Sequence, residues 1–173
     1  MAEILLIGKP DILETWWIGK NLDDGRINPH ILRAQQSDLK PFLGDALYHD
    51  FVTNVVDPKY QELLNGVEYN LQGETIFFNG VKPLLAAWAY ARVVGNNQVF
   101  TTRGGVTVKD TEESTQHPNT LVQQRDRDAQ SEALRLQHEV YNYLNQNRTK
   151  YPLYGRGIDQ DSATKQSMRF TKV

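Results

Sequence analysis

The segment "GVKPLLAAWAYARVVGNN" (residues 80–97) is the part of the chain that says most about its architecture. Nearly every position from Leu84 to Val94 is apolar or small, and Gly95 follows as a natural C-cap. A helix that is apolar around its whole circumference is buried on most sides. We therefore predict a central helix here, with Leu84, Leu85 and Trp88 in one core together with Leu47, Phe51, Val140 and Leu144.

Further helices are predicted before this segment. Asn28 and Pro29 fit the N-cap and first position of one helix, because proline needs no hydrogen-bond acceptor there. A second helix is indicated by an apolar stripe in which Leu47, Phe51 and Val55 recur every four residues. Residues 57–66 ("DPKYQELLNG") repeat the capping pattern and predict a third helix that ends at a glycine.

The last helix is predicted from about Thr120 to about Arg148. Its core-facing residues are Ala129, Ala133, Leu136, Val140 and Leu144, which share one face at helical spacing. The first half, "QQRDRDAQSEA", offers only alanines to a partner. That half is expected either to project from the body or to pack loosely against a neighbouring copy.

Two short hairpins complete the predicted fold. Alternating runs flank "NLQG" (residues 70–73), and β-favouring residues flank Gly104 and Gly105. The fold class is therefore mainly α: a helical bundle with one or two short β-hairpins, a long C-terminal helix and an extended C-terminal arm. The expected organisation is an irregular N-terminal segment over residues 1–27, a helical domain over 28–150 and the arm over 151–173.

Composition indicates an ordinary globular protein rather than a membrane or disulfide-stapled one. The 173 residues are 39% hydrophobic and 23% charged, with a net charge of −2 and no cysteine. The absence of cysteine excludes disulfides and thiolate metal sites. No apolar run is long enough for a membrane span, and the N-terminus lacks the pattern of a signal peptide. We expect a soluble protein made in the cytoplasm that needs no membrane.

The sequence shows no constellation of residues for catalysis. The four histidines lack helical ligand spacing, and the paired carboxylates lie in loop-like stretches. The prediction is that the chain is not an enzyme, and that it has no catalytic, cofactor-binding or metal-binding residues. An enzyme would need a site assembled by the fold, such as Asp45, His49 and Arg92 brought together.

The C-terminal segment "PLYGRGIDQDSATKQSMRFTKV" (residues 152–173) has no helical or strand period. It is either a disordered end or an arm that folds onto a partner, and its spaced apolar residues favour the arm. From Arg148 onward six positive residues oppose two negative ones, whereas the rest of the chain carries an excess of six negatives. A basic arm on an acidic body suits an acidic neighbour, and nucleic acid is the competing partner. The expected partner-binding residues of the arm are Leu153, Tyr154, Arg156, Ile158, Lys165, Met168, Arg169, Phe170 and Lys172.

Two adjacent tryptophans, Trp16 and Trp17, stand near the N-terminus. Neighbouring residues in an irregular segment cannot both face one core. At least one of the two is therefore a candidate interface anchor.

The order of these segments resembles the head-to-tail connector proteins of tailed bacteriophages, the adaptor or neck-ring group. The strongest motifs are "LGDALY" (residues 43–48) and "GVKPLLAAWAYAR" (residues 80–92), and the similar order covers roughly residues 20–150. The shared motifs are packing and turn motifs rather than catalytic ones.

This resemblance implies a subunit of a homo-oligomeric ring, often of twelve copies, in the neck of the virion. The ring would bind the portal protein and further neck or tail proteins, and DNA would pass through its lumen without sequence-specific binding. In such adaptors the C-terminal segment commonly extends from the helical body and inserts against the portal. The alternatives are a head-completion stopper or tail-terminator ring, which tend to be rich in strands, and a small cytoplasmic enzyme.

Overall fold

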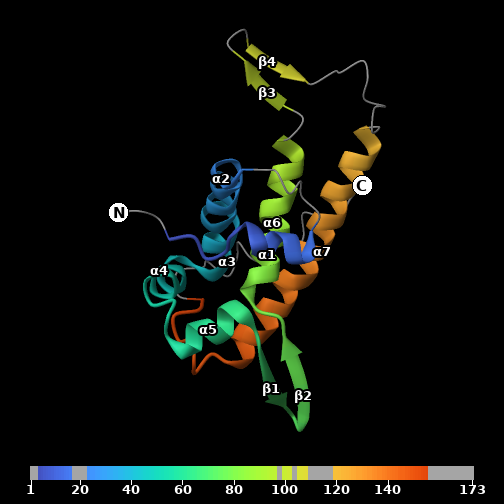
Figure 1. Cartoon of the computed structure of the whole chain (residues 1–173). Helices are drawn as coiled ribbons and strands as arrows, with labels where there is room; N and C mark the ends of the chain where they lie inside the picture. Colours follow the sequence, from blue (N-terminus) through green and yellow to red (C-terminus); the bar gives the residue numbers. More distant parts are fainter. Residues whose placement is uncertain (1–3, 17–22, 97–98, 103–104, 109–118, 156–173) are drawn as a thin grey trace.

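The structure is a computed structural model that describes residues 4–16, 23–96, 99–102, 105–108 and 119–155. Seven α-helices and two antiparallel hairpins are formed within these residues (Figure 1). The helices are α1 Lys9–Thr15, α2 Asp24–Ala34, α3 Lys40–Leu43, α4 Asp45–Thr53, α5 Pro58–Asn65, α6 Val81–Asn96 and α7 Asn119–Gln146, and a π-helical segment, η1 Gln35–Leu39, joins α2 to α3. The prediction of a mainly α fold with short hairpins and a long last helix is confirmed.

Helix α6 is the centre of the molecule, as predicted. α7 packs along one side of it, and α1 and α2 pack on other sides (Figure 1). Leu84, Leu85 and Ala87 of α6 are fully buried, and Val140 and Leu144 of α7 are at most 1% exposed. Neighbouring helices thus cover α6 on several sides, as its apolar sequence requires.

The two hairpins extend from opposite ends of the helical body (Figure 1). β1 Val67–Leu71 pairs with β2 Glu74–Phe78 in the register Val67↔Phe78, next to the start of α6. β3 Val99–Thr102 pairs with β4 Gly105–Val108 in the register Val99↔Val108, after the end of α6. In the first turn Gln72 and Gly73 both have positive φ (55° and 91°), as a tight hairpin turn requires.

Trp88 departs from the predicted core. Its side chain is only half-buried, and its ring meets that of Phe42 edge-on at 6.5 Å. The prediction failed because a helix that is apolar all round does not reveal which of its sides its neighbours leave open. Trp88 lies on the side between α2 and α7.

The N-terminal segment is more ordered than the predicted irregular stretch over residues 1–27. α1 forms within it, and α2 begins at Asp24, one turn before the predicted start at Asn28 and Pro29. Asp23 is the N-cap, and its Oδ1 accepts a hydrogen bond from the Gly25 amide at 3.3 Å. The earlier start adds the fully buried Ile27 to the core-facing stripe, so Pro29 lies inside the helix.

A π-helical segment interrupts the path from α2 to α3. The Lys40 amide bonds to the Gln35 carbonyl, one residue further back than in an α-helix. Pro41 follows directly and has no amide hydrogen to continue the regular pattern. The buried Gln35 side chain also holds the N-terminal segment: its Oε1 accepts from the Leu6 amide at 2.8 Å, and its Nε2 donates to the Ile4 carbonyl at 3.0 Å.

The predicted arm does not start at residue 151. Tyr151 is buried, and Leu153 and Tyr154 pack, half-buried, against the core of their own chain. Leu153 and Tyr154 thus pack on their own chain, which corrects the expected boundary of the arm, and their binding to a partner stays a prediction. These two side chains find apolar surface close to the end of α7, which a reading of the segment by itself does not reveal.

The central position of α6 can be tested by truncating its buried side chains. We expect Leu85→Ala to lower the free energy of unfolding by about 2–5 kcal/mol, because a fully buried leucine leaves a cavity. Leu134→Ala is the matched control at an exposed position of α7 and should change it by no more than about 0.5 kcal/mol. The measurement is equilibrium denaturation in urea, and equal effects of the two substitutions would contradict this arrangement.

Candidate functional site

The end of α7 and the turn after it are held on the body by contacts with distant parts of the chain. Lys150 forms an ion pair with Glu62 of α5. The Tyr151 hydroxyl donates a hydrogen bond to the Lys59 carbonyl at 2.6 Å. Both contacts join residues about ninety positions apart in the sequence. They tie the turn after α7 to α5.

A cluster of aromatic rings lies beneath this turn. Tyr143 of α7 stacks on Phe78 of β2, with ring centroids 4.0 Å apart and planes within 8°. Tyr151 lies 5.9 Å from Tyr143 and 6.3 Å from Tyr60, measured between ring centroids. The cluster joins the root of the C-terminal segment to the β1–β2 hairpin and to α5.

A hydrogen bond anchors the far side of this cluster. The Tyr60 hydroxyl donates to Oδ2 of Asp50 on α4. This bond holds the pKa of Asp50 below its ordinary value, and burial together with the Asp50 charge raises the pKa of Tyr60. The phenol therefore stays protonated and the carboxylate ionised, which is the state that keeps the bond.

Beyond Tyr151 the chain makes one more turn on the body. The Tyr154 amide bonds to the Tyr151 carbonyl at 3.0 Å. Burial raises the pKa of Tyr154 to about 12. Gly155, with φ of 81°, is the last described residue. The position of the chain up to Gly155 is thus fixed by contacts inside this chain.

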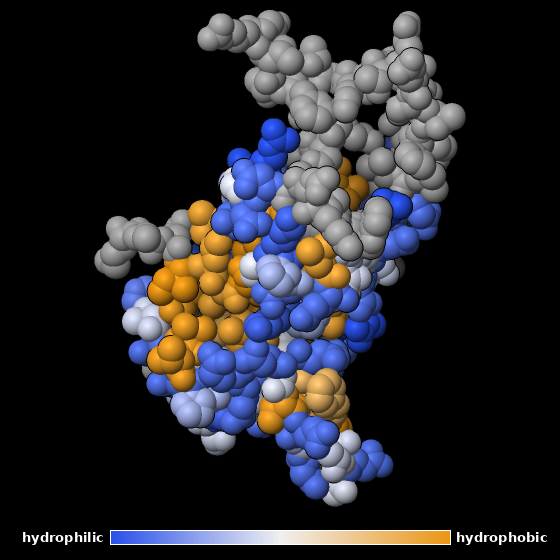
Figure 2. Space-filling view, viewed as in Figure 1, coloured by the Kyte–Doolittle hydropathy of each residue, from blue (hydrophilic) through white to orange (hydrophobic). Residues whose placement is uncertain are grey.

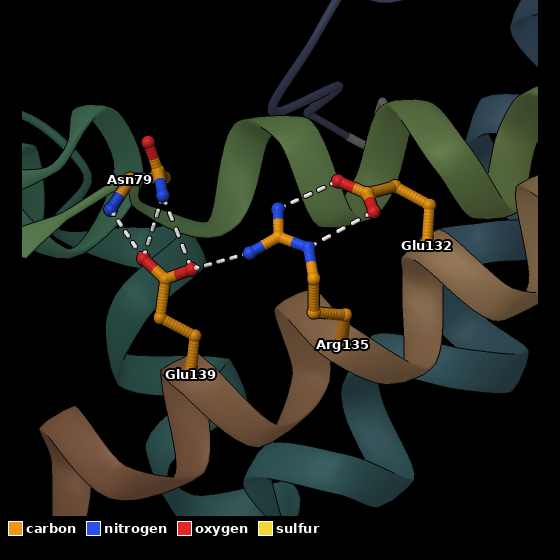
Figure 3. A network of polar contacts seen from close by, with 4 residues as sticks. All are labelled: Asn79, Glu132, Arg135 and Glu139. Carbon is orange, nitrogen blue, oxygen red and sulfur yellow. Dashed lines mark hydrogen bonds and ion pairs between the residues drawn. The ribbon is translucent and has the colours of Figure 1, made fainter.

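A polar network fixes α7 against the start of α6 (Figure 3). Glu139 Oε1 accepts hydrogen bonds from the Asn79 backbone amide at 2.7 Å and from the Asn79 side chain at 2.8 Å. Arg135 lies between two carboxylates, donating to Glu132 at 2.6 Å and to Glu139 at 3.5 Å (Figure 3). The junction between β2 and α6 is thereby held in one position along α7.

An open cleft of about 520 Å³ lies between α2 with η1, α6 and α7. Arg92 and Asp38 form a bidentate ion pair in its wall, with shortest contacts of 2.6 and 2.8 Å. Burial lowers the pKa of the nearby His30, and the charges of Arg33 and Arg92 lower it further. The lining contains two arginines and two aspartates, so its charges balance; its residues are Arg33, Asp38, Trp88, Ala91, Arg92, Asp126 and Gln130.

The structure does not assemble the catalytic group considered from the sequence. Arg92 is paired with Asp38, and Asp45 pairs instead with Lys40 at 3.4 Å. No contact among the described residues joins Asp45, His49 and Arg92. The described part of the chain also has no cluster of three or more His, Asp or Glu side chains placed to hold a metal ion.

The other predicted interface residues are only partly placed. Trp16 is half-buried, and its ring stacks on Tyr90 of α6 at 4.7 Å between centroids. Its indole nitrogen is buried and has no hydrogen-bond partner in the structure described. Trp17 lies outside the described residues, as do the arm positions Arg156, Ile158, Lys165, Met168, Arg169, Phe170 and Lys172.

Sequence comparison identifies one family, described as a family of unknown function (DUF6712), over residues 39–163. No curated protein matches the chain significantly, and neither does any solved structure. Within the described residues, no helix is both long and apolar enough to cross a membrane.

The network between α7 and α6 can be tested by removing its two carboxylates separately. Glu139→Ala should lower the free energy of unfolding by about 1–3 kcal/mol, because it leaves the half-buried Asn79 amide without an acceptor. Glu132→Ala removes only an ion pair on the surface of α7 and should cost less than about 1 kcal/mol. Chemical denaturation of the two variants measures this difference, and a larger loss for Glu132→Ala would contradict the role of Glu139.

The burial of Tyr154 predicts a loss of stability at alkaline pH. Its pKa of about 12 lies above the ordinary value of 10.0, so folding favours the protonated phenol. This contribution is complete below pH 10 and is lost as the pH rises from 10 towards 12. Tyr154→Phe should remove on the order of 2 kcal/mol of that alkaline loss and leave stability at pH 7 almost unchanged. Denaturation curves at a series of pH values test this, and an unaltered alkaline loss would show that Tyr154 is not buried.

Proposed function

We propose that this chain, which belongs to the family of unknown function DUF6712, is a structural protein of the neck of a tailed bacteriophage. In this proposal it forms a homo-oligomeric ring, often of twelve copies, between the portal and the tail. The ring continues the DNA channel without sequence-specific binding of DNA. The resemblance of "LGDALY" and "GVKPLLAAWAYAR" to adaptor proteins is the starting point.

The single observation that carries the proposal is the anchoring of residues 150–155 on the body, directly before the predicted arm. Lys150, Tyr151 and Tyr154 hold the chain on α5 and α7 up to Gly155. An arm that connects one ring to another has to leave its subunit at a defined place. Such a contact both attaches the two rings and sets their relative positions. The hydrogen-bonded root supplies that fixed point.

The composition of residues 156–173 fits the attachment. The segment contains four basic residues, Arg156, Lys165, Arg169 and Lys172, and the apolar side chains Ile158, Met168 and Phe170. Each buried apolar anchor is worth roughly 1.5–3 kcal/mol before ordering costs, so several together are needed for a stable attachment. The basic residues would meet acidic surface on the portal or an adjacent subunit, and their contribution would weaken with salt.

The helical architecture favours an adaptor over the two other ring proteins considered. Stopper and terminator rings tend to be rich in strands, whereas the strands described here are limited to two short hairpins. The proposal also makes the chain a protein without catalytic activity. The Arg92–Asp38 ion pair of the cleft and the separate environments of Asp45 and Arg92 are consistent with a structural role.

Truncation after Gly155 tests the proposal. It removes the proposed attachment residues but keeps Tyr151, Leu153 and Tyr154 on the core, so we expect an unchanged melting temperature. Binding to the portal protein encoded in the same phage genome should be lost, as measured by co-sedimentation and by assembly of heads with tails in vitro.

Two controls separate attachment from folding. Truncation after Tyr151 removes Leu153 and Tyr154 as well and should lower the melting temperature, because it uncovers part of the core. A full-length chain with Ile158, Met168 and Phe170 replaced by serine keeps the charges and should also fail to bind. Normal joining of heads to tails by the chain ending at Gly155 would contradict the proposal.

A further inference from the structure

The outer side of α7 carries an apolar stripe that the described residues do not cover. Leu134 and Tyr141 are 57% and 48% exposed, and the His138 ring lies between them and stacks with Tyr141 at 6.4 Å. These three residues, called here the outer stripe, are spaced four and three residues apart and so share one face. The buried face of the same helix consists of Ala129, Ala133, Leu136, Val140 and Leu144, which pack on the other side.

The outer stripe is flanked by positive charge. Arg127 lies on the same side of α7, seven residues before Leu134, and Arg148 lies in the turn after the helix, seven residues after Tyr141. Within the described structure neither arginine forms an ion pair. The carboxylates of α7 are engaged elsewhere: Glu132 and Glu139 with Arg135, Asp126 with Gln130, and Asp128 with Gln124. A partner for this stripe therefore needs apolar residues accompanied by negative charge.

A second apolar surface lies on the other side of α6. Figure 2 shows hydrophobic side chains gathered over the N-terminal segment and α4, and Figure 1 shows α7 on the opposite side of the central helix. Ile4, in the N-terminal segment, is 50% exposed, and Val56, in the turn after α4, is 81% exposed. The exposed apolar surface formed by the N-terminal segment, with Ile4, and by α4 with the turn after it, with Val56, is called here the N-terminal surface.

One carboxylate at this second surface is opposite in charge to the arginines that flank the outer stripe. Asp57, next to Val56, is exposed and has no ion-pair partner among the described residues. The N-terminal surface is also held in shape, because Gln35 bonds to the backbone of Ile4 and Leu6. Contiguous exposed apolar patches mark interaction sites more often than other parts of a protein surface do.

From these observations we infer that the outer stripe of α7 binds the N-terminal surface of a second copy of this chain. The two surfaces differ and lie on opposite sides of one subunit, so the contact is head-to-tail and repeats from copy to copy. A head-to-tail contact builds a ring when its rotation closes. The inference names the surfaces of the ring contact and rests on the proposed function for its biological setting, but not for the contact itself.

Two variants, each with one surface disabled, test the inference. Leu134→Glu with Tyr141→Glu disables the outer stripe, and Ile4→Glu with Val56→Glu disables the N-terminal surface. All four positions are exposed, and melting temperatures show whether each variant folds. Each variant should self-associate at least about 10-fold more weakly than the wild type in sedimentation equilibrium, because each copy has lost one half of the contact. Raised salt should weaken wild-type association.

Mixing the two variants gives the decisive result. Each retains the surface that the other lacks, so the mixture should form a 1:1 heterodimer that grows no further. Phe77→Glu is the matched control, since Phe77 is 60% exposed on the β1–β2 hairpin, and it should associate as the wild type does. The inference is overturned by a wild-type chain that stays monomeric at about 1 mM, by variants that associate normally, or by a mixture without heterodimer.

Other outcomes identify a different contact or a different failure. Loss of association only in the α7 variant would show a symmetric contact between two outer stripes, which also overturns the inference. Binding of the wild-type chain to the portal protein is measured separately. If portal binding is absent but the mixture forms the heterodimer, the proposed function fails while the contact between copies stands.

Discussion

The burial of α6 is the constraint on which the rest of the structure depends. Its sequence is apolar on nearly every side, so no single neighbour can cover it. α7 covers one side, α1 and α2 cover others, and the junction before α6 is held by Glu139 through Asn79. The hairpins at the two ends of α6 take their positions from this helix, because β2 precedes it and β3 follows it within a few residues.

The elements that local chemistry specifies could be predicted from the sequence. α5 begins at Pro58 and ends before Gly66, and the first hairpin turns at Gln72 and Gly73, since capping and turn preferences act over a few residues. α2 was misplaced by one turn because two caps competed. Asn28–Pro29 is a good local signal, but a start at Asp23 also places Ile27 in the core. The π-helical segment depends on Pro41 and on Gln35 bonding to residues 29 and 31 positions away, which no local pattern reveals.

The candidate site was less predictable than the fold for the same reason. Tyr151 bonds to Lys59 and Lys150 pairs with Glu62, contacts that span 92 and 88 residues. The sequence shows spaced apolar residues after α7 but not where they pack, so it does not reveal that Leu153 and Tyr154 contact the core of their own chain. Trp16 was considered for an interface, and in the structure its ring lies against Tyr90. An aromatic residue near a chain end can pack in the core or against a partner, and the same apolar contacts stabilise it in both places. Only the tertiary structure distinguishes the two.

Helix α7 combines three roles on three faces, and this explains its unusual sequence. Its inner face is buried from Ala129 onward and includes Ala133, whereas residues 123–128 of its polar first half are exposed except for the half-buried Asp126. A lateral face carries Glu132, Arg135 and Glu139, and Glu139 fixes the helix along its axis through its hydrogen bonds to Asn79. The outer face can therefore carry the exposed apolar residues Leu134 and Tyr141. The exposed arginines on either side of them, Arg127 and Arg148, limit the loss of solubility that these apolar residues cause. A helix fixed on two faces presents its third in a constant orientation, which is the property that a repeating contact between subunits requires.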